Sequence, residues 1–219
     1  MSSQLLVECR GAGRTYGSGS AATVALEPCD CAVGPGDRIA VVGPSGSGKS
    51  TLLHLMAGLD LPSRGQVVWP ALGPRETLRP GPVAVVFQGP SLLPPLTVRE
   101  NVALPLLLSG TDSAHAHAEA DRTLELLELS DVRDKLPQEI SGGQAQRAAV
   151  ARALAGAASL LIADEPTGQL DRESAREVVE ALIAAAATSG AALVVATHDP
   201  GVAAELDERW EIHSGRLLK

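Results

Sequence analysis

Gly43-Pro-Ser-Gly-Ser-Gly-Lys-Ser50 is the stretch that decides the fold. It follows the apolar run Arg38–Val42, which predicts a strand, and it leads into Lys49–Ala57, which predicts a helix that stops at Gly58. Glycine at three loop positions lets successive backbone N–H groups point inward, and the helix start adds its positive dipole end. The strand, loop and helix together predict a phosphate-binding loop.

A second motif places two carboxylates at the end of a buried strand. Leu160-Leu-Ile-Ala predicts that strand, and Asp164 and Glu165 follow it directly. Open α/β sheets bind ligands at the carboxyl ends of their strands, so Asp164 is a candidate for holding Mg²⁺ through water. Glu165 is the candidate for activating an attacking water. The alternative is an acidic helix cap that follows a core strand.

A third motif, Ile140-Ser-Gly-Gly-Gln144, stands between the other two in the chain. Ser141 is a plausible N-cap, and the small residues Gly142 and Gly143 allow a ligand to approach the helix predicted over Gln144–Leu154. One chain therefore has two phosphate-facing helix ends but only one loop lysine.

The full chain of 219 residues is 45% hydrophobic, and its pattern predicts one α/β domain. Short β-type runs come first and indicate an antiparallel sheet: Leu5–Cys9, Thr23–Leu26 and Cys29–Val33. Helical periodicity replaces them over residues 97–139, which we interpret as an inserted helical subdomain. Strands and helices then alternate, which predicts a parallel sheet covered on both faces.

Charge and composition exclude several classes of partner. The net charge is −8 with no run of Lys or Arg, so nucleic acid is not an expected partner.

Met1–Glu8 lacks the pattern of a secretion signal, and the longest apolar stretch, Ala181–Ala196, is too short to cross a bilayer; we therefore expect a cytoplasmic chain. Cys9, Cys29 and Cys31 are expected to be free thiols, and His115 and His117 to be solvated.

The three motifs in this order resemble the ATP-binding subunit of an ABC transporter. The resemblance implies a P-loop NTPase fold and ATP hydrolysis with Mg²⁺. The loop residues would hold the phosphates: Gly43, Pro44, Ser45, Gly46, Ser47, Gly48, Lys49, Ser50 and Thr51. Lys49 would bridge the β- and γ-phosphates, Ser50 would give its hydroxyl to Mg²⁺, and Thr51 would lie near the α-phosphate.

Three residues outside the motifs also match the family. Gln88, after the strand predicted at Val83–Phe87, resembles the glutamine that touches Mg²⁺ and the attacking water. His198, after the strand Leu193–Thr197, resembles the histidine that contacts the γ-phosphate, although a histidine after a strand is often a surface residue. Tyr16 matches the aromatic residue that stacks on adenine, and its alternative role is packing.

The resemblance further implies a shared active site. In this family two subunits pack head to tail, and ATP lies between the lysine loop of one subunit and Ser141, Gly142, Gly143 and Gln144 of the other. Gly168-Gln-Leu-Asp171 resembles the loop that crosses this interface, with Asp171 as its characteristic residue. The partner would be an identical subunit or a closely related twin.

Motif details are similar to the lipoprotein-release and macrolide-export branch and to its cell-division relative. There the ATPase sits on the inner face of the membrane and drives a separate transmembrane subunit. Leu92, Leu93 and Pro94-Pro95 stand where the family forms a groove for that subunit, although buried packing of these leucines is the equal alternative. Ile140, Ala145 and Gln169 depart from the usual pattern. Two alternative functions fit the sequence less well. A soluble DNA-repair or chromosome ATPase would carry a long insertion between the motifs, and none is present. A regulator that hydrolyses little ATP would not need Glu165, which is present.

Overall fold

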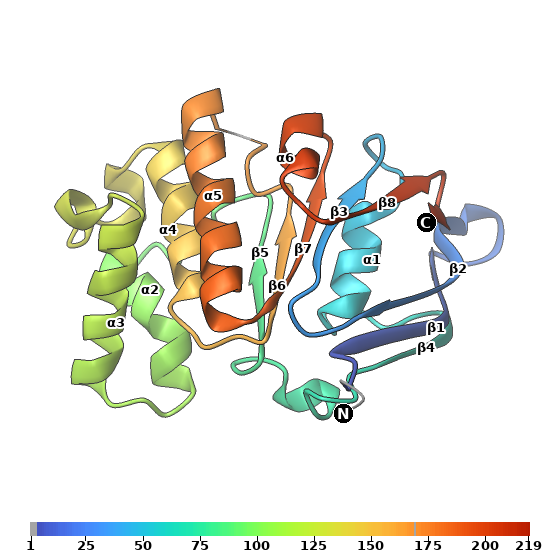
Figure 1. Ribbon diagram of the computed structural model, residues 1–219, viewed down its shortest axis with the longest axis horizontal. Coiled ribbons are helices and arrows are strands. Elements are labelled where there is room, and N and C mark those ends of the chain that lie inside the picture. The colour runs from blue at the N-terminus through green and yellow to red at the C-terminus, as the bar shows by residue number, and fades with distance from the viewer. Residues whose placement is uncertain (1–3, 169) are drawn as a thin grey trace.

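A parallel sheet forms the centre of the computed structural model, which describes residues 4–168 and 170–219 (Figure 1). Within these residues, six strands lie in the order β5-β6-β7-β3-β8-β9. Their bounds are Val83–Val86, Leu160–Asp164, Ala192–Thr197, Arg38–Val42, Glu208–His213 and Arg216–Leu218. Every pairing is parallel except the hairpin of β8 with β9. The predicted parallel sheet is confirmed.

Alternate residues of the strands build two separate cores. Ile39 and Val41 of β3 point to one face, where they pack with helix α1 (Lys49–Met56) and the antiparallel sheet. Ala40 and Val42 point to the other face, where helices α4 (Gly142–Leu154), α5 (Arg172–Ser189) and α6 (Pro200–Ala204) cover the sheet. Side chains of a strand alternate in direction, so a strand buried on both faces is apolar throughout. The phosphate-loop helix and the helix of the third motif therefore lie on opposite faces.

The predicted antiparallel sheet is also confirmed, with longer strands than expected. Among the described residues it contains three strands in the order β2-β1-β4, with bounds Thr23–Val33, Val7–Tyr16 and Arg64–Val68. Thr23–Leu26 and Cys29–Val33 were expected as separate strands, and this expectation is wrong. They join across Pro28 into β2, because irregular pairing with β1 between Arg14 and Cys9 accommodates the residues that break the pattern.

Helices α2 (Val98–Leu108) and α3 (Ser113–Leu126) follow β5 and pack with α4 at the end of the molecule far from the antiparallel sheet (Figure 1). Thr97 and Glu100 form a capping box at the start of α2. The buried Asn101 side chain bonds to the backbone of Leu93 and so fixes the loop before the helix. Short 3-10 turns lie at Gly19–Ala21, Arg75–Thr77, Ser130–Val132 and Pro137–Glu139. The expectation that residues 97–139 form a separate subdomain stays a prediction.

The cysteines are buried free thiols, as expected. Cys9 lies opposite Cys31 in the pairing of strands β1 and β2, without a disulfide. The nearby Cys31 thiol and burial raise the pKa of the Cys29 thiol. The described residues contain no group of three or more His, Cys, Asp or Glu side chains that could hold a metal ion, and none of their helices is long and apolar enough to span a membrane. The side chain of His115 is exposed, and His117 bonds within its own helix.

Leu193 tests the two-sided core, because it is fully buried in the central strand β7. Leu193→Ala should lower the free energy of unfolding by about 2–5 kcal/mol, since it leaves a cavity in close-packed surroundings. Leu218→Ala, at a leucine that is 47% exposed, is the matched control and should change the value by about 0.5 kcal/mol or less. Urea titration followed by circular dichroism measures both. Equal effects would contradict the assignment of Leu193 to the core.

Candidate functional site

The phosphate loop is held in its curved path by close backbone contacts. Gly43 has a φ of 152°, and a Cβ there would lie 2.1 Å from the carbonyl oxygen of Ile212. Gly48, before the first residue of α1, has a φ of 111°, and a Cβ there would lie 2.4 Å from the carbonyl oxygen of Ala25. Neither position can accept another residue without movement of the backbone. β2 and β8 therefore press on the loop and fix its shape.

Lys49 lies inside this loop and is only 6% exposed. Its Nζ donates to the carbonyl oxygens of Gly43 at 2.9 Å and Pro44 at 3.2 Å, and it lies 3.3 Å from Oε1 of Glu165. The charge of a buried ammonium needs such partners. The lysine is thus placed at the centre of the loop, between the loop carbonyls and the end of β6.

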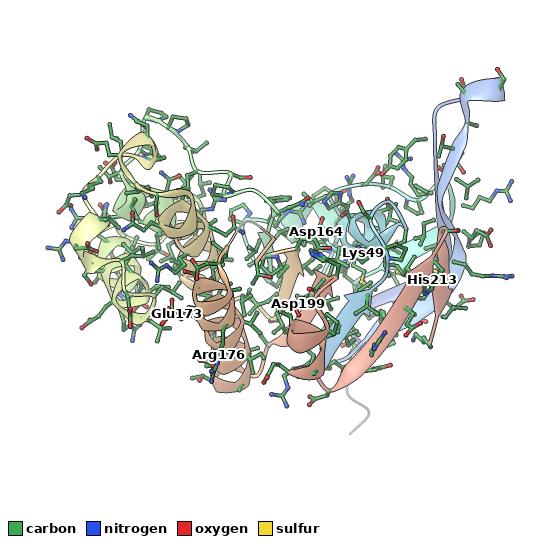
Figure 2. All side chains as sticks on the ribbon, turned by 90° about the horizontal axis from the view of Figure 1, so that it is seen from above. Lys49, Asp164, Glu173, Arg176, Asp199 and His213 are labelled. Atoms are coloured by element: carbon green, nitrogen blue, oxygen red, sulfur yellow. The ribbon has the colours of Figure 1, made fainter. Side chains whose placement is uncertain are left out.

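Asp164, the last residue of β6, lies beside Lys49 (Figure 2). Burial raises the pKa of its carboxyl, whereas the neighbouring Ser50 hydroxyl and His54 oppose this shift. His54 Nε2 is 3.9 Å from Oδ2. Oδ1 is buried and has no hydrogen-bond partner among the described residues. The buried Asp164 carboxylate and the neighbouring Ser50 hydroxyl together form a suitable set of oxygen ligands for Mg²⁺.

Glu165 connects the ends of three elements. Its Oε2 lies 2.7 Å from Nδ1 of His198, which follows β7, and its Oε1 faces Lys49. Its backbone has a φ of 48°, and its N–H donates to the carbonyl oxygen of Ala196 at 2.9 Å. A non-glycine residue in this region is uncommon, and such conformations gather at functional sites. The carboxylate is thus held between an imidazole and an ammonium.

Gln88 is exposed just after β5, the neighbour of β6. A Cβ on Gly168 would lie 3.9 Å from its Nε2, so Gln88 faces the turn that follows Glu165. The predicted residues Lys49, Asp164, Glu165, Gln88 and His198 are therefore at one edge of the sheet.

Tyr16 stands at the end of β1 with 40% of its surface exposed. Its hydroxyl donates to Oδ2 of Asp60 at 2.9 Å. The Arg14 guanidinium lies 4.7 Å from the ring centre and bonds to Oδ1 of Asp60 at 2.9 Å. Arg14 and Asp60, which the sequence reasoning missed, therefore hold the Tyr16 ring in place.

The third motif forms a capped helix start. The Ser141 Oγ accepts from the Gln144 N–H at 3.2 Å, and Gln144 Oε1 accepts from the Ser141 N–H at 3.0 Å, which confirms the predicted N-cap. Asp171 caps α5 in a similar way, accepting from the N–H groups of Glu173 and Ser174. Residue 169, where the sequence departs from the usual pattern, lies outside the described residues. The structure does not bring Ser141 near Lys49, because α4 and α1 cover opposite faces of the sheet (Figure 1).

Comparisons with known proteins decide the family. The sequence profile described as ABC transporter matches residues 26–168. The chain belongs to the ABC transporter family. The ABC protein is 40% identical to the lipoprotein-releasing system ATP-binding protein LolD of Shewanella sp. (strain MR-4), over 97% of this chain and 95% of the relative. It is 42% identical to the protein of the same name from Xanthomonas campestris pv. campestris (strain 8004), over 94% and 89%.

Solved structures agree with this assignment. The ATP-binding cassette MJ0796, in a dimeric post-hydrolysis state bound to ADP and Pi, has a TM-score of 0.90 at 31% identity and covers 97% of each chain. A second structure, cbiO1 from Clostridium perfringens, part of the ABC transporter complex cbiONQ, has a TM-score of 0.83 at 25% identity over 99% of this chain and 88% of that one. The ABC protein is an ATP-binding and ATP-hydrolysing subunit, as the motif order indicated.

Tyr16 gives a test of base binding. Tyr16→Ala should weaken ATP binding by about 1–3 kcal/mol, because an exposed ring that stacks on adenine contributes about that much. Tyr16→Phe is the matched control: it keeps the ring face, loses only the bond to Asp60, and should lose less. Isothermal titration calorimetry with a non-hydrolysable ATP analogue measures both. An unchanged affinity in folded Tyr16→Ala would assign Tyr16 to packing.

Proposed function

We propose that the protein binds ATP with Mg²⁺ in the phosphate loop, hydrolyses it in a head-to-tail dimer, and drives a separate transmembrane subunit of the lipoprotein-releasing type. The observation that carries the chemistry is the contact of Glu165 with both Lys49 and His198 at the mouth of the loop. The identity of 40–42% to lipoprotein-releasing ATP-binding proteins supports the type of system.

The loop residues take the phosphates. The backbone N–H groups of residues 45–50 at the start of α1 would form the cradle. Lys49, which now donates to the carbonyl oxygens of Gly43 and Pro44, would donate to phosphate oxygens instead. This exchange also moves the ammonium charge away from Glu165. Thr51, a buried residue in the first turn of α1, would lie near the α-phosphate.

Ser50 and Asp164 would hold Mg²⁺, and Gln88 would contribute a further oxygen ligand from the end of β5. The unpartnered Oδ1 of Asp164 fits this role, since a bound cation would stabilise its buried charge. The metal ion, when bound, neutralises charge that develops on the β- and γ-phosphate oxygens.

Glu165 acts as the general base on the attacking water, and His198 orients the Glu165 carboxylate. The 2.7 Å contact with His198 fixes one carboxylate oxygen, so the other is directed toward the loop. A base must be placed in this way before its basicity matters.

Glu165→Gln tests the chemistry. The amide keeps the shape but cannot accept a proton, so the rate of ATP hydrolysis should fall by about a hundredfold or more while ATP still binds. Phosphate release and nucleotide affinity are measured side by side, with EDTA as the control for the metal. Glu125→Gln, at an exposed carboxylate on α3, is the matched variant and should keep the wild-type rate. Hydrolysis at the wild-type rate in Glu165→Gln would remove Glu165 from this role.

The dimer follows from the positions of α1 and α4. Within one chain the turn at Ser141, Gly142, Gly143 and Gln144 cannot reach the phosphate loop, because the sheet lies between them. In a head-to-tail dimer that turn faces the ATP of the partner subunit, and Asp171 lies at the crossing loop. The dimeric state of the solved cassette at 31% identity supports this arrangement.

Heterodimers purified through two tags test the shared site. A Lys49→Ala subunit paired with a Ser141→Arg subunit has both lesions in one composite site and one intact site, so one equivalent of ATP should remain trapped. A Lys49→Ala/Ser141→Arg subunit paired with wild type has a lesion in each composite site, so trapping should vanish. Retained nucleotide is measured after rapid gel filtration. The opposite pattern would show that each site is contained in one chain.

A groove of about 480 Å³ between β5, α2 and α4 is the proposed docking site for the transmembrane subunit. Phe87, Leu104 and the exposed Leu93 and Leu108 line it, with Arg79 and Arg152 at its sides. Leu92 instead packs on the core, so the two leucines for which the sequence left docking and packing open lie in different surroundings. An apolar helix that carries an acidic residue would fit this groove, and the ATPase would then lie on the inner face of the membrane.

A further inference from the structure

Gln146 is a buried polar side chain outside the residues discussed so far. It lies on α4 and is 1% exposed. Its Nε2 donates to the carbonyl oxygen of Phe87 at 3.1 Å and to that of Pro166 at 3.0 Å. Because both partners are acceptors, the amide nitrogen must face them. A single side chain therefore bonds to two backbone segments that are distant in the sequence.

These two segments carry the proposed catalytic residues. Phe87 immediately precedes Gln88, and Pro166 immediately follows Glu165. They extend from the neighbouring parallel strands β5 and β6, beyond the last paired residues Val86 and Ala163. The Gln146 amide thus replaces the strand-to-strand hydrogen bonds at the point where the ladder ends.

The same helix begins at Ser141. Gln146 lies five positions after Ser141, which corresponds to about 7.5 Å along a helix axis. A helix is rigid over this distance, so a shift of its N-terminal turn moves Gln146 with it. The next residue, Arg147, bonds to Glu177 of α5 and makes no hydrogen bond to either strand end among the described residues.

Stability alone does not account for the Gln146 amide. Its Oε1 is buried without a hydrogen-bond partner among the described residues, and an unpaired buried acceptor is unfavourable. The amide therefore makes two useful bonds while it leaves one polar atom unsatisfied. Such a group fixes a geometry more than it strengthens a core.

We propose that Gln146 is a positioning residue that couples the Ser141 turn to the backbone beside Gln88 and Glu165. When the turn is held against the ATP of the partner subunit, Gln146 sets the strand ends of its own chain for hydrolysis. The proposal rests on the composite site described above and adds to it a link between the two sites of the dimer.

Gln146→Met tests the link, since methionine has a similar length and no N–H group. The kcat for ATP hydrolysis should fall by about tenfold or more, while the affinity for a non-hydrolysable ATP analogue stays within about twofold of wild type. Gln146→Asn keeps the amide but is one methylene shorter, so it cannot reach both carbonyl groups. It should show the same split, and it serves as the test if the methionine variant does not fold.

Arg147→Gln is the matched control, because it removes the adjacent bond between α4 and α5. It should keep kcat close to wild type, even if the melting temperature falls. An unchanged kcat in folded Gln146→Asn, a parallel loss of kcat and affinity, or an equal loss of kcat in Arg147→Gln would each overturn the proposal. The proposed function fails separately, if wild-type protein does not hydrolyse ATP or if Glu165→Gln hydrolyses it normally.

Discussion

Parallel pairing of β5, β6, β7 and β3 is the constraint on which the site depends. Because parallel strands end at the same edge of a sheet, the residues that follow them meet there whatever their distance in the chain. Gln88, Asp164, Glu165 and His198 come from three of these ends, and the fourth leads into the phosphate loop. The two cores, one on each face, keep the strands in register and so hold this edge in place.

Charge balance at that edge explains why the site needs its ligands. Lys49, Asp164 and Glu165 are all buried, and one ammonium faces two carboxylates. Lys49 pairs with Glu165, whereas burial raises the pKa of Asp164 and leaves one of its oxygens without a partner. A divalent cation would restore the balance at Asp164, and phosphate oxygens would take Lys49 from Glu165. In the proposed mechanism, ATP binding and the preparation of Glu165 as a base are therefore parts of one electrostatic rearrangement.

The opposite placement of α1 and α4 makes each chain an incomplete enzyme in the proposed mechanism. Its own sheet separates the Ser141 turn from Lys49, so a second chain must supply the missing surface. In the proposed coupling, Gln146 connects that surface to the catalytic edge through its two hydrogen bonds at the strand ends.

The sequence by itself determined the phosphate loop, the carboxylate pair, the capped helix at Ser141 and the parallel sheet. Each of these depends on neighbouring residues: glycines in a loop, an apolar strand before an acid, or a serine three residues before its capping partner. Only the tertiary structure decided the joining of β2 across Pro28, the Arg14–Asp60 contacts of Tyr16, the different burial of Leu92 and Leu93, and the two hydrogen bonds of Gln146. In Gln144-Ala-Gln-Arg147 nothing local separates a buried glutamine from an exposed one. The difference arises because strand ends far away in the sequence place their carbonyl groups beside one face of the helix.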